Sequence, residues 1–264
     1  MLLTVFLSCS ILGAVVGFLA GLLGIGGGLV IVPALVYILT ELGVLESHVM
    51  PMALATSLAS IIITSSSAAL THHKNGNIVW RHAFSISVAV AIGSFGGALI
   101  ASHLPADVLK LVFAFFVICI ASYMIASLKV ARDIGEPSRL LLKIIGLITG
   151  VIASILGIAG GAILVPSLSY FGIPLRSAMG IATVCGVVVA IFGVLGFLIT
   201  GSQVEGLPQW SFGYVYLPAL LGIIVTSAFT APLGVKAAAN LPVASLKKYF
   251  AVFLILVAIK MVWF

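Results

Sequence analysis

The chain has 264 residues, of which 62% are hydrophobic and only 7% are charged, with a formal net charge of +6 and a mean hydropathy of +1.37. Soluble domains carry about 25% charged residues, so this composition excludes a soluble enzyme and a nucleic-acid-binding domain. Apolar stretches long enough to cross a ~30 Å hydrocarbon core recur along the chain, and we expect an all-α polytopic membrane protein without a soluble domain.

The first apolar run covers residues 3–40 and contains the sequence GLLGIGGGLVIVP from Gly21 to Pro33. No basic segment precedes it, so it is interpreted as a span and not as a cleaved signal. Glycine and proline weaken a helix interior by roughly 1 and about 3 kcal/mol relative to alanine. A break at Gly24–Gly28 would leave a helix of about 20 residues and a stub of about 12, only ~18 Å long. This pattern predicts a broken or re-entrant element.

The remaining apolar runs follow in regular order. They predict helices at 50–71, 83–101 and 106–128, a second initial run at 144–170, and helices at 178–200, 212–232 and 243–263. Cys9, Cys119 and Cys185 lie inside apolar runs without CxxC spacing, which is typical of small buried hydrophobic residues.

The order of these runs reflects a duplication. The segment at 17–33 returns at 150–166, MALATS at 52–57 returns as MGIATV at 179–184, and the LP-initiated segment at 104–124 returns at 241–261. We therefore predict a first transmembrane repeat at 1–128, a cytoplasmic linker at 129–142 and a second transmembrane repeat at 143–264.

The distribution of lysine and arginine tests the orientation of the two repeats. If each initial run crosses the membrane once, the repeats have four spans each and are parallel, and the basic residues divide between the two sides. If each run goes across and back, the repeats are inverted and every Lys and Arg except Lys110 and Lys260 lies inside. The positive-inside rule favours the second arrangement. We expect two inverted repeats, each with a glycine-broken or re-entrant first element and three helices, giving 8–10 membrane segments.

The duplicated glycine segments are candidate anion sites. A helix that begins in such a segment presents unpaired N–H groups and a positive dipole end, and glycine lets the backbone approach a ligand closely. The alternative is a small-residue surface for close helix packing. The predicted cradle consists of Gly24, Gly26, Gly27, Gly28, Gly157, Ala159, Gly160 and Gly161.

Hydroxyl side chains provide a second candidate set. Thr56 and Thr183 occupy matching positions about six residues into their helices, ~9 Å from the ends, and Ser57 follows Thr56. A stripe of further hydroxyls continues along one helix face of the first repeat at Ser60, Thr64, Ser67 and Thr71, whereas the second repeat is apolar there. Either the stripe lines an aqueous path, or its hydroxyls bond to backbone carbonyls and neighbouring helices.

Several chemistries find no support in the sequence. No Asp or Glu lies well inside a span, which disfavours a carboxylate proton relay and a metal-cation site. No GxSxG or HExxH motif indicates an intramembrane hydrolase. His72, His73 and His82 flank one loop, where they are either proton-coupling groups or ordinary interfacial histidines. Lys110 and Lys247 occupy matching positions and are expected to snorkel to the interface.

The segments GLLGIGGGLVIVPAL, HHKNGNIVWRHA, GIAGGAILVPSL and LPQWSFGYVYLPALLGI resemble the TauE/SafE sulfite exporter family, also called the four-toluene sulfonate uptake permease group. The resemblance covers essentially the whole chain. It implies an integral membrane transporter of the bacterial inner membrane that moves sulfur-containing anions such as sulfite, sulfonates or sulfoacetate, driven by an ion gradient. In the second glycine segment Ala159 replaces the glycine at position 26, and its methyl group would narrow one side of the cradle.

The sequence as a whole predicts a secondary transporter that moves a small anion by alternating access, with no cofactor and no metal. An anion channel with the same lining is the first alternative, and an intramembrane enzyme is the second. The expected partners are the anionic substrate, a proton as coupling ion and membrane lipid, but no nucleic acid. Assembly into a homo-oligomer is left open.

Overall fold

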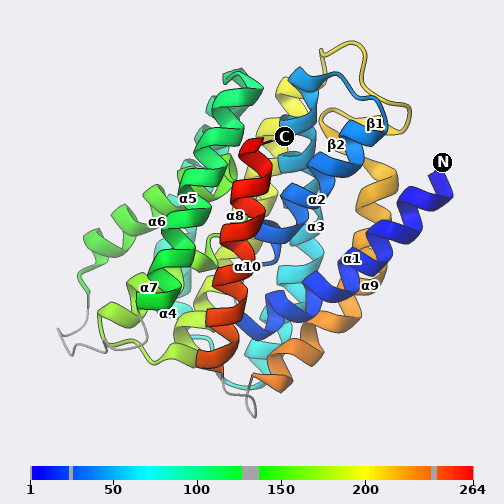
Figure 1. Cartoon of the computed structure of the whole chain (residues 1–264). Coiled ribbons are helices and arrows are strands. Elements are labelled where there is room, and N and C mark those ends of the chain that lie inside the picture. Colours follow the sequence, from blue (N-terminus) through cyan, green and yellow to red (C-terminus); the bar gives the residue numbers. More distant parts are fainter. Residues whose placement is uncertain (1, 24–25, 127–136, 239–242, 264) are drawn as a thin grey trace.

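The computed structural model describes residues 2–23, 26–126, 137–238 and 243–263. Ten helices and one short β-hairpin make up the described part of the chain (Figure 1). The elements are α1 (Leu2–Leu23), α2 (Gly28–Glu41), α3 (Glu46–Lys74), α4 (Trp80–His103), α5 (Ala106–Ala126), α6 (Arg139–Ile155), α7 (Gly161–Tyr170), α8 (Leu175–Gly201), β1 (Ser211–Phe212), β2 (Val215–Tyr216), α9 (Leu217–Ala237) and α10 (Val243–Trp263).

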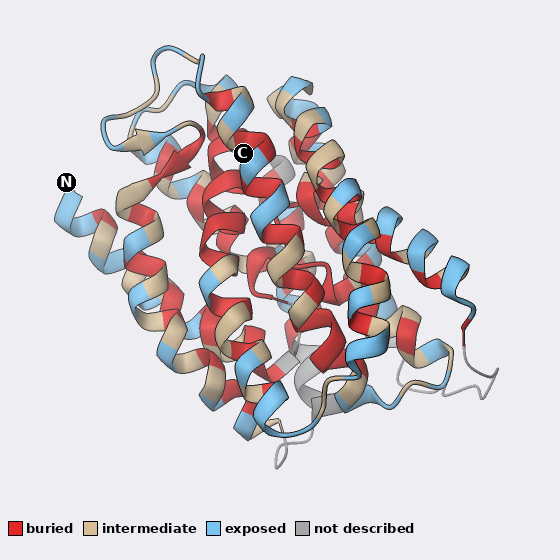
Figure 2. Cartoon of the chain, turned by 180° about the vertical axis from the view of Figure 1, so that it is seen from behind, coloured by how far each residue is buried: buried red, intermediate tan, exposed pale blue. Residues whose placement is uncertain are grey.

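Six of these helices are long and apolar enough to cross a membrane, namely α1, α3, α4, α5, α8 and α9. Large apolar side chains cover the outside of the bundle: Leu3 is 69% exposed, Phe115 62% and Phe229 76%. Figure 2 shows the buried residues gathered along the middle of the bundle and the exposed ones on its outer helices. Such a surface is stable only against hydrocarbon, so the chain is an integral, polytopic, all-α membrane protein.

Both expected breaks in the initial runs are present. The first run divides into α1 and the shorter α2, and the second divides into α6 and the shorter α7. Five helices therefore precede the linker and five follow it, which is the upper end of the predicted 8–10 segments.

The contacts between helices have the same pattern in both sets of five. α1, the first helix, packs chiefly on α9, the ninth, and α6 packs in the equivalent way on α4. α3 packs against its counterpart α8, and α5 against its counterpart α10. Each set thus packs its first helix on the fourth helix of the other set, so neither set forms a separate bundle.

The two sets also run in opposite directions across the bundle. The first half of α3 contacts the β-hairpin through Thr56, and α8 ends beside the same hairpin, where Gly201 lies against Tyr214. At the opposite end, the loop after α3 lies against Gly180 near the start of α8. α3 and α8 are therefore antiparallel. This supports the proposed division into inverted repeats.

Glycines allow the closest helix crossings. A Cβ atom at Gly13 or Gly17 of α1 would overlap the backbone or hydroxyl groups of α9. A Cβ atom at Gly146 or Gly150 of α6 would overlap the carbonyl groups of α4. Gly146 and Gly150 are the repeat counterparts of Gly13 and Gly17. Small-residue packing, which was one interpretation of the glycine-rich segments, is thus found in the flanking helices.

One predicted helix start is wrong. The helix expected to begin at residue 212 begins at Leu217, because the preceding residues form a hairpin in which Ser211 pairs with Tyr216 and Phe212 with Val215. These strands are two residues long and continue an apolar run. Their pattern therefore could not be distinguished from the first turn of a helix.

Candidate functional site

The two glycine segments have the same backbone geometry. Gly27 precedes α2 with a φ of 74°, and Gly160 precedes α7 with a φ of 75°. Both values lie in the left-handed region, which glycine adopts without steric cost. A Cβ at Gly27 would in addition meet the side chain of Val16. The helix breaks therefore depend on glycine at these positions. Gly24 lies outside the described residues.

The two segments meet each other in the middle of the protein. A Cβ atom at Gly28 would overlap the carbonyl oxygen of Gly157, and one at Gly26 would overlap the methyl group of Ala159. Ser57 of α3 donates a hydrogen bond to the Gly157 oxygen over 2.7 Å and so fixes the second segment against α3. The methyl group of Ala159 thus lies against Gly26 of the first segment.

The short helices α2 and α7, here called the half-helices, follow the two glycine segments. N–H groups in their first turns have no hydrogen-bond acceptor in the rest of the described chain. Ile163 and Leu164 donate to the Gly160 carbonyl, whereas Gly161 and Ala162 have no acceptor among the described residues. In the first segment, Leu29 likewise has no acceptor among those residues. Unpaired N–H groups at a helix N-terminus, together with the helix dipole, favour a negative charge.

Beside the two segments lies a small cavity of about 10 Å³, here called the central cavity. Its lining comes from α1, both glycine segments, α3 and α8, and consists of Ala20, Gly26, Thr64, Ser65, Ala68, Ala159, Ala182 and Thr183. This volume has room for about one water molecule and is far below the roughly 300–1,000 Å³ of typical ligand pockets, so a larger ligand does not fit in this conformation.

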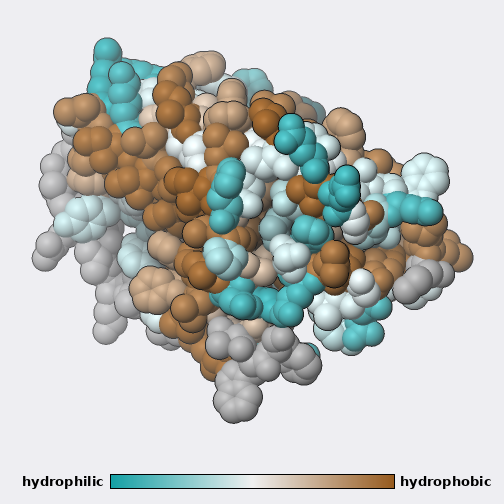
Figure 3. Space-filling view, turned by 90° about the horizontal axis from the view of Figure 1, so that it is seen from above, coloured by the Kyte–Doolittle hydropathy of each residue, from teal (hydrophilic) through white to brown (hydrophobic). Residues whose placement is uncertain are grey.

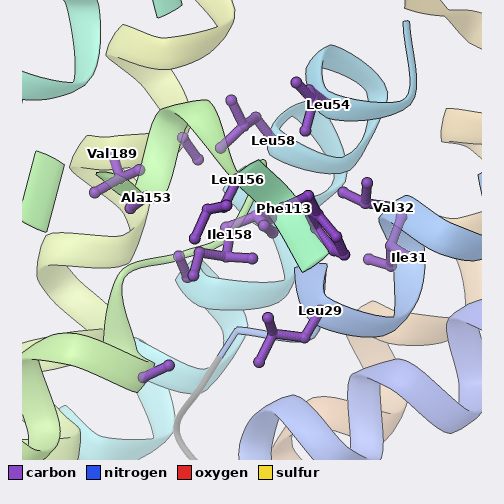
Figure 4. Close-up of a cluster of buried hydrophobic side chains, with 14 of the residues drawn as sticks. Leu29, Ile31, Val32, Leu54, Leu58, Phe113, Ala153, Leu156, Ile158 and Val189 are labelled. Atoms are coloured by element: carbon purple, nitrogen blue, oxygen red, sulfur yellow. The ribbon is translucent and has the colours of Figure 1, made fainter. Parts of the chain in front are cut away.

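An apolar shell surrounds the glycine segments. Figure 4 shows Leu54 and Leu58 of α3 close to Leu156 and Ile158 of the second segment, and these four side chains are fully buried. A low-dielectric surrounding strengthens the interaction of any bound charge with nearby dipoles. It also penalises a charge that finds no donors.

Ser65 supplies the hydroxyl that is free to bind a ligand in the central cavity. It is 3% exposed and, within the described chain, forms no hydrogen bond. Thr183 also lines the cavity, but its hydroxyl donates to the Gly180 carbonyl over 2.8 Å. Thr64 donates to the Ser60 carbonyl and contacts the Ser227 hydroxyl at 3.0 Å.

The predicted site residues therefore have different positions. Gly26, Ala159 and Thr183 line the cavity, while Gly27, Gly28, Gly157, Gly160 and Gly161 shape the two segments beside it. Thr56 and Ser57 lie outside it and bond to the β-hairpin and to Gly157.

The hydroxyl stripe on α3 bonds mainly within the protein. Ser60 and Thr71 donate to carbonyls one turn earlier, and Ser67 donates to the Ala228 carbonyl of α9. These bonds favour the second interpretation of the stripe, in which its hydroxyls bond to backbone carbonyls and neighbouring helices, over the lining of an aqueous path. Ser65 was not among the predicted site residues. It lies on a different face of α3, together with Ala68 and His72. The spacing of three and four residues between these side chains could have indicated this shared face.

His72 lies on this face near the end of α3. It is 3% exposed, and its Nε2 atom has no hydrogen-bond partner among the described residues. Its Nδ1 atom is 3.3 Å from the Asn77 amide nitrogen, and the Asn77 carbonyl lies against Gly180 of α8. His72 thus places a buried imidazole on the same face of α3 as Ser65 and Ala68, close to the loop after α3 that contacts α8.

The β-hairpin covers the opposite end of α3. The Tyr216 N–H donates to the Thr56 hydroxyl over 3.0 Å, and the Tyr214 ring packs edge-on against Phe197 at 6.3 Å. Burial raises the pKa of the Tyr214 hydroxyl above its ordinary value, so this side chain stays neutral at physiological pH. The hairpin is thus an uncharged cover over one end of the site.

We expect Thr56→Val to loosen this cover. The substitution leaves the buried Tyr216 N–H without an acceptor, which costs about 1–3 kcal/mol. Thermal unfolding in detergent should then occur at a lower temperature, and amide hydrogen exchange at Tyr216 should accelerate. Thr200→Val is the control, because the Thr200 hydroxyl bonds only to carbonyls of its own helix. Equal rates of amide exchange at Tyr216 in both variants would show that the Thr56 hydrogen bond does not hold the hairpin in place.

The described residues contain no cluster of His, Cys, Asp or Glu that could hold a metal ion. Their carboxylates, Glu41, Glu46, Asp107 and Glu205, lie at helix ends or in loops. The lining of the central cavity contains the hydroxyl groups of Thr64, Ser65 and Thr183 and no carboxylate.

Comparison with known proteins gives consistent results. Residues 9–261 match the family model described as "Sulfite exporter TauE/SafE". The chain is 43% identical over 259 residues to a "Probable membrane transporter protein" of Haemophilus influenzae, covering 98% of each chain. It is 30% identical over 228 residues to one of Methanocaldococcus jannaschii, covering 86% of this chain and 84% of the relative. No solved structure matches the chain significantly.

Proposed function

The chain belongs to the sulfite exporter TauE/SafE family, and on this premise we propose that it carries a small sulfur-containing anion across the bacterial inner membrane by alternating access. The substrate class is sulfite, a sulfonate or sulfoacetate. The observation that carries the proposal is the central cavity, which is lined by the Ser65 hydroxyl and by one residue of each glycine segment, Gly26 and Ala159, close to the starts of α2 and α7. Transporters with inverted repeats bind anionic groups at such half-helix N-termini.

The surroundings of the cavity support a carrier more than a channel. The β-hairpin covers one end of α3, and the loop after α3 packs against α8 at the other end. The cavity between them is small, at about 10 Å³. A carrier passes through such a closed state each time the site changes sides, whereas a channel conducts through a continuous opening. No chemically reactive constellation among the described residues favours the enzyme alternative.

A proton is the proposed coupling ion, and His72 is its proposed carrier. Histidine is the side chain that most readily gains and loses a proton in proteins, and this one is buried on the cavity-lining face of α3. Charged imidazolium in such a position is stabilised by an anion nearby. Binding of the proton and of the substrate would therefore favour each other, which is the thermodynamic requirement for coupled transport.

Flux measurements in proteoliposomes test both parts of the proposal. We expect sulfite uptake that saturates with concentration and follows an imposed pH gradient. In His72→Gln, sulfite exchange between the two sides should persist, but uptake driven by the pH gradient should fall about tenfold or more, which corresponds to about 1.4 kcal/mol. The matched control is His73→Gln, because His73 is exposed and packs on the Trp80 ring at 5.5 Å.

Different results contradict different parts. Non-saturating flux with single-channel currents would identify a channel. Full gradient-driven uptake in His72→Gln would remove His72 as the proton carrier while leaving sulfite transport in place. Absence of flux with sulfite, sulfonates and sulfoacetate would overturn the proposed substrate class.

A further inference from the structure

A large groove opens on the lipid-facing side of the bundle, away from the central cavity. It lies between α1, α2 and α10, with one wall completed by α5, and has a volume of about 900 Å³. Its walls consist mostly of apolar side chains, and several of these side chains are strongly exposed: Ile11 is 70% exposed, Val15 53% and Phe253 45%.

The groove exists because α2 has few protein neighbours. α2 packs mainly against α3 and touches α1 and α10 only slightly. With 14 residues it is about 21 Å long, so it cannot fill the space between the two longer helices beside it. In a bilayer this space is next to acyl chains, which pack against apolar walls without exposing them to water.

Charged side chains stand at one end of the groove. Lys110 and Glu46 form an ion pair of 3.0 Å, and the Lys260 ammonium lies 5.9 Å from the centre of the Tyr37 ring. Glu41, the last residue of α2, lines the same end. The view from above in Figure 3, which looks onto the hairpin end of the bundle, shows hydrophilic side chains interspersed among hydrophobic ones. The rim thus presents two ammonium groups and two carboxylates next to an apolar groove.

We propose that the groove binds one zwitterionic phospholipid with an ethanolamine headgroup. Its acyl chains lie along α2, its phosphate lies near Lys260 and Lys110, and its ammonium lies near Glu41 and Glu46. A purely anionic headgroup would bring negative charge close to Glu41 and Glu46, of which Glu46 alone is paired with Lys110. A choline headgroup lacks the N–H donors that shorten and strengthen bonds to carboxylates.

The bound lipid would complete the packing of α2, the half-helix that begins at the first glycine segment. A ligand that binds the folded state alone stabilises that state. The proposal does not depend on which substrate is carried, because no groove residue lines the central cavity.

Native mass spectrometry of the purified full chain in detergent tests the proposal. Phosphatidylethanolamine, phosphatidylcholine and phosphatidylglycerol with identical acyl chains are each titrated into the delipidated protein. We expect one phosphatidylethanolamine to bind at least fivefold more tightly than either other lipid, an order-of-magnitude expectation for a few charge-assisted contacts. The same lipid should raise the unfolding temperature.

Two variants examine the two ends of the groove. Val15→Trp fills the apolar part, and Lys260→Gln removes a charge from the rim; both should abolish the preference. Val88→Trp, at a site 66% exposed on α4, and Lys143→Gln, on α6, are the matched controls and should preserve it.

Size-exclusion chromatography shows whether each variant is folded. Should Val15→Trp fail to fold, Lys260→Gln alone decides the outcome. Equal binding of the three lipids, or an unchanged preference in folded variants, would overturn the proposal.

Discussion

Gly28→Ala is expected to reduce sulfite transport about 5- to 150-fold, while Gly96→Ala leaves it unchanged. Both glycines lie in helices, Gly28 in the first turn of α2 and Gly96 within α4. A Cβ atom at Gly28 would overlap the Gly157 carbonyl oxygen and lie 2.8 Å from the Ile158 Cα, whereas one at Gly96 would meet no atom within 4 Å. Since Gly28 lacks a positive φ, alanine adds only a methyl group and no backbone strain.

The expected loss follows from the rigidity of the obstructing atoms. Backbone atoms of the second glycine segment cannot move aside as a flexible side chain can, so the two half-helix ends must separate. Overpacking of this kind costs typically about 1–3 kcal/mol, or about 5- to 150-fold in an equilibrium between states. Gly27→Val is a less informative change, because the positive φ of Gly27 would add strain of its own.

Transport of sulfite by proteoliposomes, normalised to the amount of folded protein in the membrane, measures the effect. Normal flux in Gly28→Ala would show that the contact between the two segments is not needed for transport. Loss of folded protein in Gly28→Ala would be separated from loss of transport by its unfolding temperature.

Ser65→Ala is expected to raise the KM for sulfite about 10- to 150-fold. This figure follows from the loss of one hydrogen bond to a charged ligand, which is worth about 1.5–3 kcal/mol. Ser65 lines the central cavity and forms no hydrogen bond within the described chain, so its removal leaves no buried protein group without a partner. The stability of the protein should therefore change little.

The matched control for this prediction is Ser67→Ala, two residues further along the same helix. The Ser67 hydroxyl donates to the Ala228 carbonyl over 2.8 Å and lies outside the cavity lining. We expect Ser67→Ala to affect unfolding and leave KM unchanged, the reverse of Ser65→Ala. An unchanged KM and maximal rate in Ser65→Ala would exclude the central cavity as the place where sulfite binds.

The helices could be predicted because the bilayer limits the choices. A backbone in hydrocarbon must satisfy its own hydrogen bonds, so a run of about 20 apolar residues becomes a helix. The same constraint made the glycines at 24–28 and 157–161 conspicuous, since an uninterrupted helix would not use them. The hairpin at 211–216 was missed because it lies outside this constraint, where an apolar run is compatible with strand and helix alike.

The site could be predicted only in part, because local patterns do not show which side of a helix meets which neighbour. Thr56 and Ser57 were selected for their position in the duplicated block, yet Thr56 bonds to the hairpin and Ser57 to Gly157. Ser65 belongs to the same run of hydroxyls and faces the cavity instead. The rotation of α3 that separates these roles is set by its packing against α8 and α9.

The sequence by itself determined that the chain is a duplicated helical membrane protein with a glycine break in each half, because these features follow from composition, length and repetition. Only the tertiary structure decided that the two breaks touch, that Gly28 lies against Gly157, and that Ser65 faces the cavity beside them. These contacts join residues about half the chain apart. They depend on how the helices cross, and helix crossing is a property of packing between segments rather than of any one segment.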